Sequence, residues 1–325
     1  MNTFKKVGLT ALGTSLIATS AFAADMSVTG GASITYSGTT GNDTGNGFAM
    51  NDAITFAASG ELDNGWTVAV SMELDGNAGG TTNSKLDNRS ITIGMGDMGT
   101  LSFVGHGGSS AMGNVDDVTP AVYGESWDIL PAGNKGVATP AGAIGSATDD
   151  NTWFYSNSSL MDGLKVSLSY VPANKATENS SSTDWALEYT GIDGLKLGIA
   201  QGENNAGATS AHTDNSTAYA VYAYGPVTIG YQVSEIDAST TAASDDFTAI
   251  GISYAVSDSL SIGYNESAYD FGDQAADQEN TAIAFSYTSG GMTISGAMVE
   301  ELNRNGSTLA VNDVEGYEIA VSFAF

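Results

Sequence analysis

Apolar and polar residues alternate along most of this chain, and this period of two restricts the fold more than any other feature of the sequence. In WTVAVSMEL (66–74) every second residue is large and apolar, and LKVSLSY (164–170) and IAFSY (283–287) repeat the pattern. An extended strand directs successive side chains to opposite faces, so each segment has one apolar face. After residue 23 no segment has helical periodicity, and no apolar run approaches the ~18 residues of a membrane-spanning helix. The sequence therefore predicts an all-β fold.

The connections between the predicted strands alternate between short turns and long polar loops. The short connections combine Gly with Asp or Asn, as in SLMDG (159–163) and GIDG (191–194), which is the chemistry of hairpin turns. Seven short turns and eight long loops give sixteen strands. We predict them at 26–37, 51–61, 66–74, 89–95, 100–105, 152–156, 164–171, 184–190, 195–202, 216–224, 226–234, 246–254, 260–268, 280–287, 292–300 and 314–325.

An even strand number, an apolar face on each strand and long loops on one side only are typical of an antiparallel transmembrane β-barrel in an outer membrane. In hydrocarbon, an unpaired strand edge leaves backbone N–H and C=O groups unsatisfied, at several kcal/mol for each group. The last strand must therefore pair with the first. This explains why VEGYEIAVSFAF (314–325) keeps its apolar residues on one side up to Phe325. Outer-membrane lipid is then a partner of the barrel. The alternative fold is a soluble secreted β-protein, such as an adhesin or lectin.

The first residues predict export. Lys5 and Lys6 precede an apolar stretch that ends in Ala21-Phe22-Ala23, a small-x-small cleavage site. This pattern indicates a secretory signal peptide over 1–23, cleaved from the mature chain. No composition break divides the remainder, so 24–325 is predicted to be one barrel domain in the bacterial outer membrane.

The charge of the chain excludes one class of partner. Nine Lys and Arg stand against 37 Asp and Glu, which gives a formal net charge of −28. Such a field repels the phosphate backbone, so nucleic acid is not an expected partner. The absence of cysteine removes disulfides, thiol nucleophiles and thiolate metal ligands.

Several motifs resemble catalytic or cofactor sites, but each lacks its context. GMGDMG (94–99) matches a dinucleotide fingerprint, yet a further strand follows it instead of a helix that could bind a pyrophosphate. The two histidines, His106 and His212, fall in different loops, and His106 near Ser109 and Ser110 is only a weak hint of a hydrolase. We therefore expect no enzyme activity and no cofactor. A weak possibility of a Ca²⁺ site, without EF-hand spacing, remains at Asp116, Asp117, Asp149 and Asp150.

The segment NTWFYSNSSLMDGLKVSLSY (151–170) resembles the sixth and seventh strands of general diffusion porins of Gram-negative bacteria. GTLSFVG (99–105) before a long loop and the terminal Phe325 are also similar to that family, especially to the porins of alphaproteobacteria. The resemblance implies a homotrimer of water-filled channels. One departure is that the family usually lines one wall of its constriction with several Arg or Lys, whereas this chain has hardly any to place there.

The long loop 106–151 contains GNVDDVTPAVYGESWDIL (113–130). In the resembling family the third long loop folds into the barrel and narrows the pore. The resemblance thus implies that this loop folds into the pore, with Trp127 or Tyr123 packing it against the wall. The alternative is an outward cap over the pore, because sequence does not show which way a loop folds. By resemblance, the constriction residues are Asp116, Asp117, Glu125 and Asp128.

The alternation also predicts which side chains face the lumen, since they lie opposite the apolar face. Arg89 shares the parity of Ile91 and Ile93, so it should face outward. Acidic rings favour cations by lowering their electrostatic barrier, and we therefore predict a cation-preferring pore. The predicted pore wall consists of Glu61, Glu73, Glu188 and Glu318 with Lys165 and Lys196.

These observations support three hypotheses for function. The first is a general diffusion channel that passes small hydrophilic solutes and cations passively. The second is a substrate-specific outer-membrane channel, although phosphate channels need basic lumens and most aromatic residues here have lipid-facing parity. The third is the soluble secreted β-protein described above.

Overall fold

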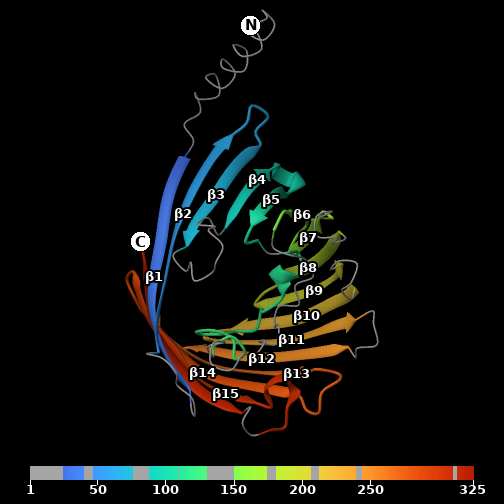
Figure 1. Cartoon of the computed structure of the whole chain (residues 1–325). Coiled ribbons are helices and arrows are strands. Elements are labelled where there is room, and N and C mark those ends of the chain that lie inside the picture. Colours follow the sequence, from blue (N-terminus) through green and yellow to red (C-terminus); the bar gives the residue numbers. More distant parts are fainter. Residues whose placement is uncertain are drawn as a thin grey trace, which may run out of the picture.

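The computed structural model describes residues 25–39, 47–75, 88–108, 110–129, 150–173, 181–205, 212–238, 244–309 and 313–325. The predicted signal peptide, 1–23, lies outside this part of the chain. All sixteen predicted strands are present, and they enclose one ring (Figure 1). Their bounds are β1 (Asp25–Thr39), β2 (Phe48–Glu61), β3 (Thr67–Asp75), β4 (Arg89–Gly94), β5 (Thr100–His106), β6 (Thr152–Met161), β7 (Leu164–Val171), β8 (Ser182–Ile192), β9 (Leu195–Asn205), β10 (His212–Tyr224), β11 (Val227–Ala238), β12 (Asp245–Ala255), β13 (Leu260–Asp270), β14 (Gln278–Ser289), β15 (Met292–Leu302) and β16 (Val314–Ala324).

The barrel closes where the two ends of the chain meet. Each strand pairs antiparallel with its neighbours in sequence, and β1 pairs with β16 from Gly31 opposite Ala324 to Thr39 opposite Gly316. Past the last strand residue, the Gly30 amide donates to the Phe325 carbonyl at 2.8 Å, and the Phe325 amide donates back at 3.0 Å. The predicted pairing of the last strand with the first is confirmed, and the ring has no open edge. No helix among the described residues is long and apolar enough to cross a membrane.

Tight turns close the hairpins at one end of the barrel. Met161 pairs with Leu164 and Ile192 pairs with Leu195, which leaves two residues in each turn. Gly163 has a φ of +74°, a left-handed conformation that glycine adopts without strain. A Cβ at Gly163 would lie 2.5 Å from the Gly191 amide nitrogen in the neighbouring turn. The close approach of that turn therefore also excludes a side chain at position 163.

The two faces of the wall differ as the alternation predicts. On β13, Ile262 and Tyr264 are exposed on the outer face, whereas Gly263, Asn265 and Ser267 are buried on the inner face. A soluble barrel would show the reverse, with apolar residues inside. The arrangement is stable when hydrocarbon covers the outside and polar groups face inward.

Outward-facing carboxylates occur near the long-loop ends of several strands. Glu235 lies opposite Asp246 across β11 and β12, and Glu300 lies opposite Glu315 across β15 and β16. Ionised side chains are costly in the hydrocarbon region. These carboxylates therefore indicate where the apolar band ends on that side.

Some strand ends depart from the sequence prediction, and one strand breaks the alternation. β6 continues to Met161, beyond the predicted end at 156, and β8 begins at Ser182, before the predicted start at 184. These strands are longer than predicted because backbone pairing continues beyond the last residues that alternate between apolar and polar. In YAVYAY (219–224), Tyr222 and Tyr224 are exposed on the outer face, whereas the Tyr219 hydroxyl donates to the inward-facing Glu188 at 2.9 Å.

Candidate functional site

The candidate site is the inner face of the barrel and the loop segment 110–129, which follows β5 and lies within the ring of strands (Figure 1). The beginning of this segment packs against the inner wall. The Ala111 amide donates to Ser169 Oγ on β7 at 3.0 Å. Met112 and Val115 are fully buried in an apolar cluster whose wall members are Ala186, Ala200 and Tyr219.

The middle of the segment is held by one wall side chain. Gln232 on β11 is completely buried, and its Oε1 accepts a hydrogen bond from the Val118 amide at 3.2 Å. Its Nε2 donates to the Asp116 carboxylate. A single amide thus contacts the loop through both its acceptor and its donor.

The end of the segment crosses to the last strands. The Tyr123 hydroxyl donates to Glu318 on β16, and Trp127 packs edge-on against Phe247 on β12 with ring centroids 5.0 Å apart. Asn265 Nδ2 on β13 donates to the Gly124 carbonyl at 3.4 Å. Both aromatic residues proposed as anchors therefore contact the wall. The segment lies against inward-facing residues, not as an outward cap.

The four predicted constriction carboxylates lie close enough to interact. Burial, followed by the charges of Asp116, Glu125 and Asp128, raises the pKa of Asp117 to about 8. Asp117 Oδ1 is buried without a hydrogen-bond partner among the described residues, and its backbone has a φ of +52°. Burial also raises the pKa of Glu125 and that of Asp128. Together they form one acidic cluster, of which Asp128 is the exposed member.

The six predicted wall residues all have inward parity, but their surroundings differ. Glu188 accepts from Lys165 Nζ at 2.8 Å and from Lys196 Nζ at 2.9 Å, so both basic residues are paired with one buried carboxylate. Glu318 is bonded to the loop, as described above. Glu61 is exposed at the short-turn end of β2. Glu73 accepts from Thr55 at 3.1 Å and from Asn88 at 2.9 Å.

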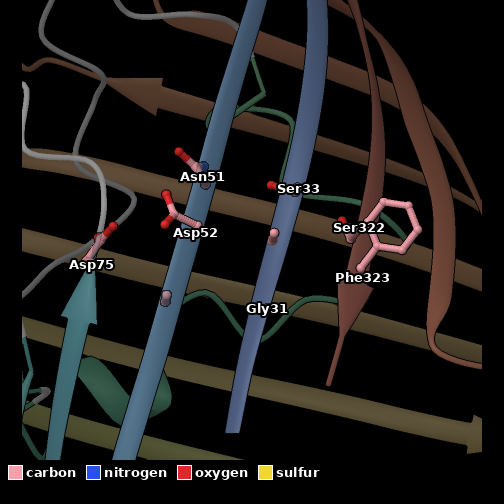
Figure 2. A pocket seen from close by; sticks show the side chains of 9 residues that line it. Gly31, Ser33, Asn51, Asp52, Asp75, Ser322 and Phe323 are labelled. Carbon is pink, nitrogen blue, oxygen red and sulfur yellow. The ribbon is translucent and has the colours of Figure 1, made fainter.

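The inner face is less buried along β1–β3 than along the strands that hold the loop. The inward-facing residues Asn215, Asn265 and Asn280, on β10, β13 and β14, are almost fully buried. On β2 and β3, Asn51 is exposed and Asp75 is only partly buried. A hollow of about 380 Å³ lies where β1, β2, β3 and β16 meet, with Asn51 and Asp75 on neighbouring strands beside it (Figure 2). The water-accessible side of the lumen therefore runs along β1–β3, across from the wall that holds the loop.

The motifs with possible chemistry have structural explanations. His106 Nδ1 contacts Asp150 Oδ1 at 2.5 Å, which joins the end of β5 to the residues just before β6. GMGDMG forms the short turn between β4 and β5, with one 3₁₀ turn at Gly96–Met98. No group of three or more His, Asp or Glu among the described residues is placed to hold a metal ion. Of the residues considered for Ca²⁺ or catalysis, Ser109 and Asp149 lie outside the described part.

Sequence reasoning missed the wall residues that hold the loop, above all Gln232, Asn265 and Phe247. Parity alone places Gln232 inside, because it alternates with the outward-facing Tyr231 and Val233. Parity does not show at which height in the barrel the loop contacts the wall. The only sequence feature that could have indicated a contact with the loop was a polar amide on the inner face.

Comparisons with known proteins agree with this geometry. A family model described as Gram-negative porin matches residues 8–307. No curated protein matches the chain. Among solved structures, the chain is similar to the anion-selective porin from Comamonas acidovorans, with 14% identity, a TM-score of 0.70, and coverage of 93% of this chain and 100% of that one.

Two further solved structures are similar over nearly their whole length. OmpF of Salmonella typhi, in a complex with daunomycin, has 15% identity and a TM-score of 0.67, covering 92% of this chain and 97% of that one. OmpT, an outer membrane protein of Vibrio cholerae, has 14% identity and a TM-score of 0.66, covering 93% and 98%. These likenesses show that the fold is shared.

Proposed function

Because this chain belongs to the Gram-negative porin family and is an outer-membrane diffusion channel, we propose that it is a general diffusion porin that prefers cations. Small hydrophilic solutes and cations cross it without chemical change. The observation that carries the proposal is the acidic cluster of the loop, Asp116, Asp117, Glu125 and Asp128, seated on one side of the lumen. We further propose that this loop narrows the pore.

The cation preference follows from a comparison of the charges on the inner face. Lys165 and Lys196 share Glu188 as their partner, so the positive charge of this wall is partly neutralised. The charges that act on Asp117 are those of Asp116, Glu125 and Asp128, which are all negative, and Glu73 and Asp75 lie on the open side. Carboxylates around a narrow passage lower the barrier for cations and raise it for anions.

The other two hypotheses receive less support. Membership of an outer-membrane family overturns the soluble secreted protein. A substrate-specific channel for sugars needs aromatic rings exposed along the lumen, but the inward-facing Tyr219, Phe247 and Tyr269 are buried. Their hydroxyl groups or rings contact the wall or the loop.

We also propose that the protein is a homotrimer, as the family resemblance implies. The outward face of β4–β6 carries an apolar depression of about 240 Å³. Arg89 is exposed on the same face, as its parity predicts, and a guanidinium that faces lipid has an energetic cost that grows with its depth. A neighbouring copy that covers this face would remove that cost and fill the depression. The depression is lined by Ile91, Ile93, Leu101, Phe103 and Trp153.

Planar-bilayer recording tests the channel and its assembly together. The purified full-length protein is expected to insert in uniform conductance steps, with each inserted particle closing under voltage in three equal sub-steps. In a KCl gradient the reversal potential should lie on the K⁺ side. A reversal potential on the Cl⁻ side would refute the cation preference, and closure in single steps would refute the trimer. An absence of any conductance from correctly folded protein would refute the channel itself.

The protonation of Asp117 predicts a pH-dependent selectivity. Its carboxyl group has a pKa raised to about 8, so it is mainly neutral below this pH and negative above it. Raising the pH from about 7 to about 9 therefore adds about 0.8 of a negative charge to the cluster, and the K⁺/Cl⁻ permeability ratio should rise roughly two- to fivefold. Reversal potentials at the two pH values give this ratio. The Asp117→Asn variant should lose the rise, and the same rise in that variant would assign the titration to another group.

A further inference from the structure

Three glycines form a continuous strip on the inner face of β11, β12 and β13. Gly230 lies opposite Gly251 in the ladder between β11 and β12, and Gly263 lies opposite Ser253 in the next ladder. All three are on the face that points away from lipid, and all three are buried. Glycine inside a strand weakens it, and it often marks the close approach of another backbone.

The backbone that approaches this strip is that of the loop. A Cβ built at Gly251 would lie 2.9 Å from the Pro120 nitrogen and 3.1 Å from its carbonyl carbon, and closer still to its carbonyl oxygen. A Cβ at Gly263 would lie 2.6 Å from Val122 Cγ2, and one at Gly230 would overlap the Pro120 ring. Because main-chain atoms of Pro120 occupy the space, rotation of a side chain cannot relieve the overlap at Gly251.

Polar groups border the strip on the same face. Gln232 follows Gly230 by two residues, and Asn265 follows Gly263 by two residues, so each amide points inward beside its glycine. Gln232 bonds the loop at Asp116 and Val118, before Pro120, and Asn265 bonds it at Gly124, after Val122. The sequence shows this arrangement as a repeat, IGYQ (229–232) and IGYN (262–265).

We propose that Gly230, Gly251 and Gly263, bordered by Gln232 and Asn265, form a seat that fixes the position of loop segment 118–124 and so sets the cross-section of the pore. This inference rests on the proposed function. The missing side chains let the loop lie directly on the wall, and the amides fix it along the strip. The open lumen lies on the other side, along β1–β3. A side chain added to the seat therefore displaces the loop into the passage.

The first test compares two glycine substitutions in strands. Gly251→Val should lower the unit conductance to roughly half, because ion flow falls with the open cross-section of the passage. Gly60→Val, on the outer face of β2, is the control for adding a side chain to a strand glycine, since a Cβ there meets nothing within 4 Å and should leave the conductance unchanged. Both variants are first checked for folding by heat-dependent gel migration. A conductance of folded Gly251→Val equal to or above that of the control would overturn the proposal.

The second test reads the seat without any channel measurement. The chain has no cysteine, so Val122→Cys combined with Gly263→Cys introduces a single pair of thiols. The Val122 Cβ lies 3.2 Å from the position of a Cβ at Gly263, close to the roughly 3.5–4.5 Å that separates Cβ atoms in disulfides. The folded protein should form this disulfide on mild oxidation, seen as faster migration of the denatured, unreduced chain. Val122→Cys with Gly60→Cys should not form it.

The two tests separate the inference from the function on which it rests. A crosslink in Val122→Cys/Gly263→Cys supports the seat even if wild-type protein conducts nothing, in which case the proposed function fails alone. Absence of the crosslink in folded protein overturns the seat even when wild-type conductance is normal. A crosslink that forms and leaves the conductance at the wild-type value shows that the seated loop is the conducting state.

Discussion

Replacement of Asp116, Asp117, Glu125 and Asp128 by their amides is expected to lower the K⁺/Cl⁻ permeability ratio roughly tenfold, to near unity. At 4 Å, one unit charge acts on a passing ion with about 1 kcal/mol in water and about 4 kcal/mol at the effective dielectric of a protein surface. The cluster contributes fewer than four full charges, since the pKa of Asp117 is raised to about 8. Even two effective charges within the Debye length of about 8 Å suffice for a tenfold change. The measurement is the reversal potential in a KCl gradient.

The amides keep the size of the acids and one acceptor oxygen, so the hydrogen bond that Gln232 Nε2 donates to residue 116 can persist. A matched control replaces four carboxylates in the short turns, Asp63→Asn, Asp162→Asn, Asp193→Asn and Asp258→Asn. These residues are exposed between strands, and their charges lie away from the loop. The control should keep the cation preference. If both sets of substitutions lower the ratio equally, the preference arises from net charge and not from the loop.

Deletion of residues 317–325 is expected to abolish folding into lipid vesicles altogether. These residues provide most of the pairs between β16 and β1, from Gly38 opposite Tyr317 to Gly31 opposite Ala324. Without them β1 and β15 each present an open edge to hydrocarbon, where every unsatisfied backbone group costs several kcal/mol. Several such groups exceed the 5–15 kcal/mol by which a typical protein is stable.

Refolding of the urea-denatured chain into vesicles, followed by heat-dependent gel migration, measures this effect on folding alone. Deletion of the nine residues 131–139, which lie outside the predicted strands, is the control. This variant should still give a folded, heat-sensitive band. A folded band from the chain that lacks 317–325 would show that the barrel closes by another pairing. In that case the seam between β1 and β16 would not be essential.

The sequence predicts the barrel well because one physical cause acts on every strand. Hydrocarbon selects apolar residues at alternate positions, as on β13 at Ile262 and Tyr264, and the register of each strand follows from them. The alternation of apolar and polar residues fails where a large side chain is needed on the inner face. Tyr219 breaks the alternation of β10, since its hydroxyl is bonded to Glu188 on the inner face. Strand ends such as that of β6 are also mispredicted, because residues beyond the apolar band face water and can be either polar or apolar.

The candidate site was predictable only in part. The acidic residues 116, 117, 125 and 128 follow from resemblance to a family, and the structure brings them together on the loop. Their anchors could not be found from the chain alone. Gln232 and Glu318 meet the loop across more than a hundred residues of sequence, and parity gives the face of a side chain but not its depth. The buried glycines at 230, 251 and 263 look in sequence like weak points in strands, although each makes room for the loop.

The loop leaves and re-enters the wall at two strands that are already joined. β5 and β6 pair directly, from Thr100 opposite Ser156 to Val104 opposite Thr152, so the ring is continuous at the point where the long insertion departs. The strand pairing of the barrel therefore does not depend on the loop, although the inner face holds the loop in place. Evolution can rewrite the insertion, and an engineer can transplant one from another barrel, without redesigning the surface that meets the membrane.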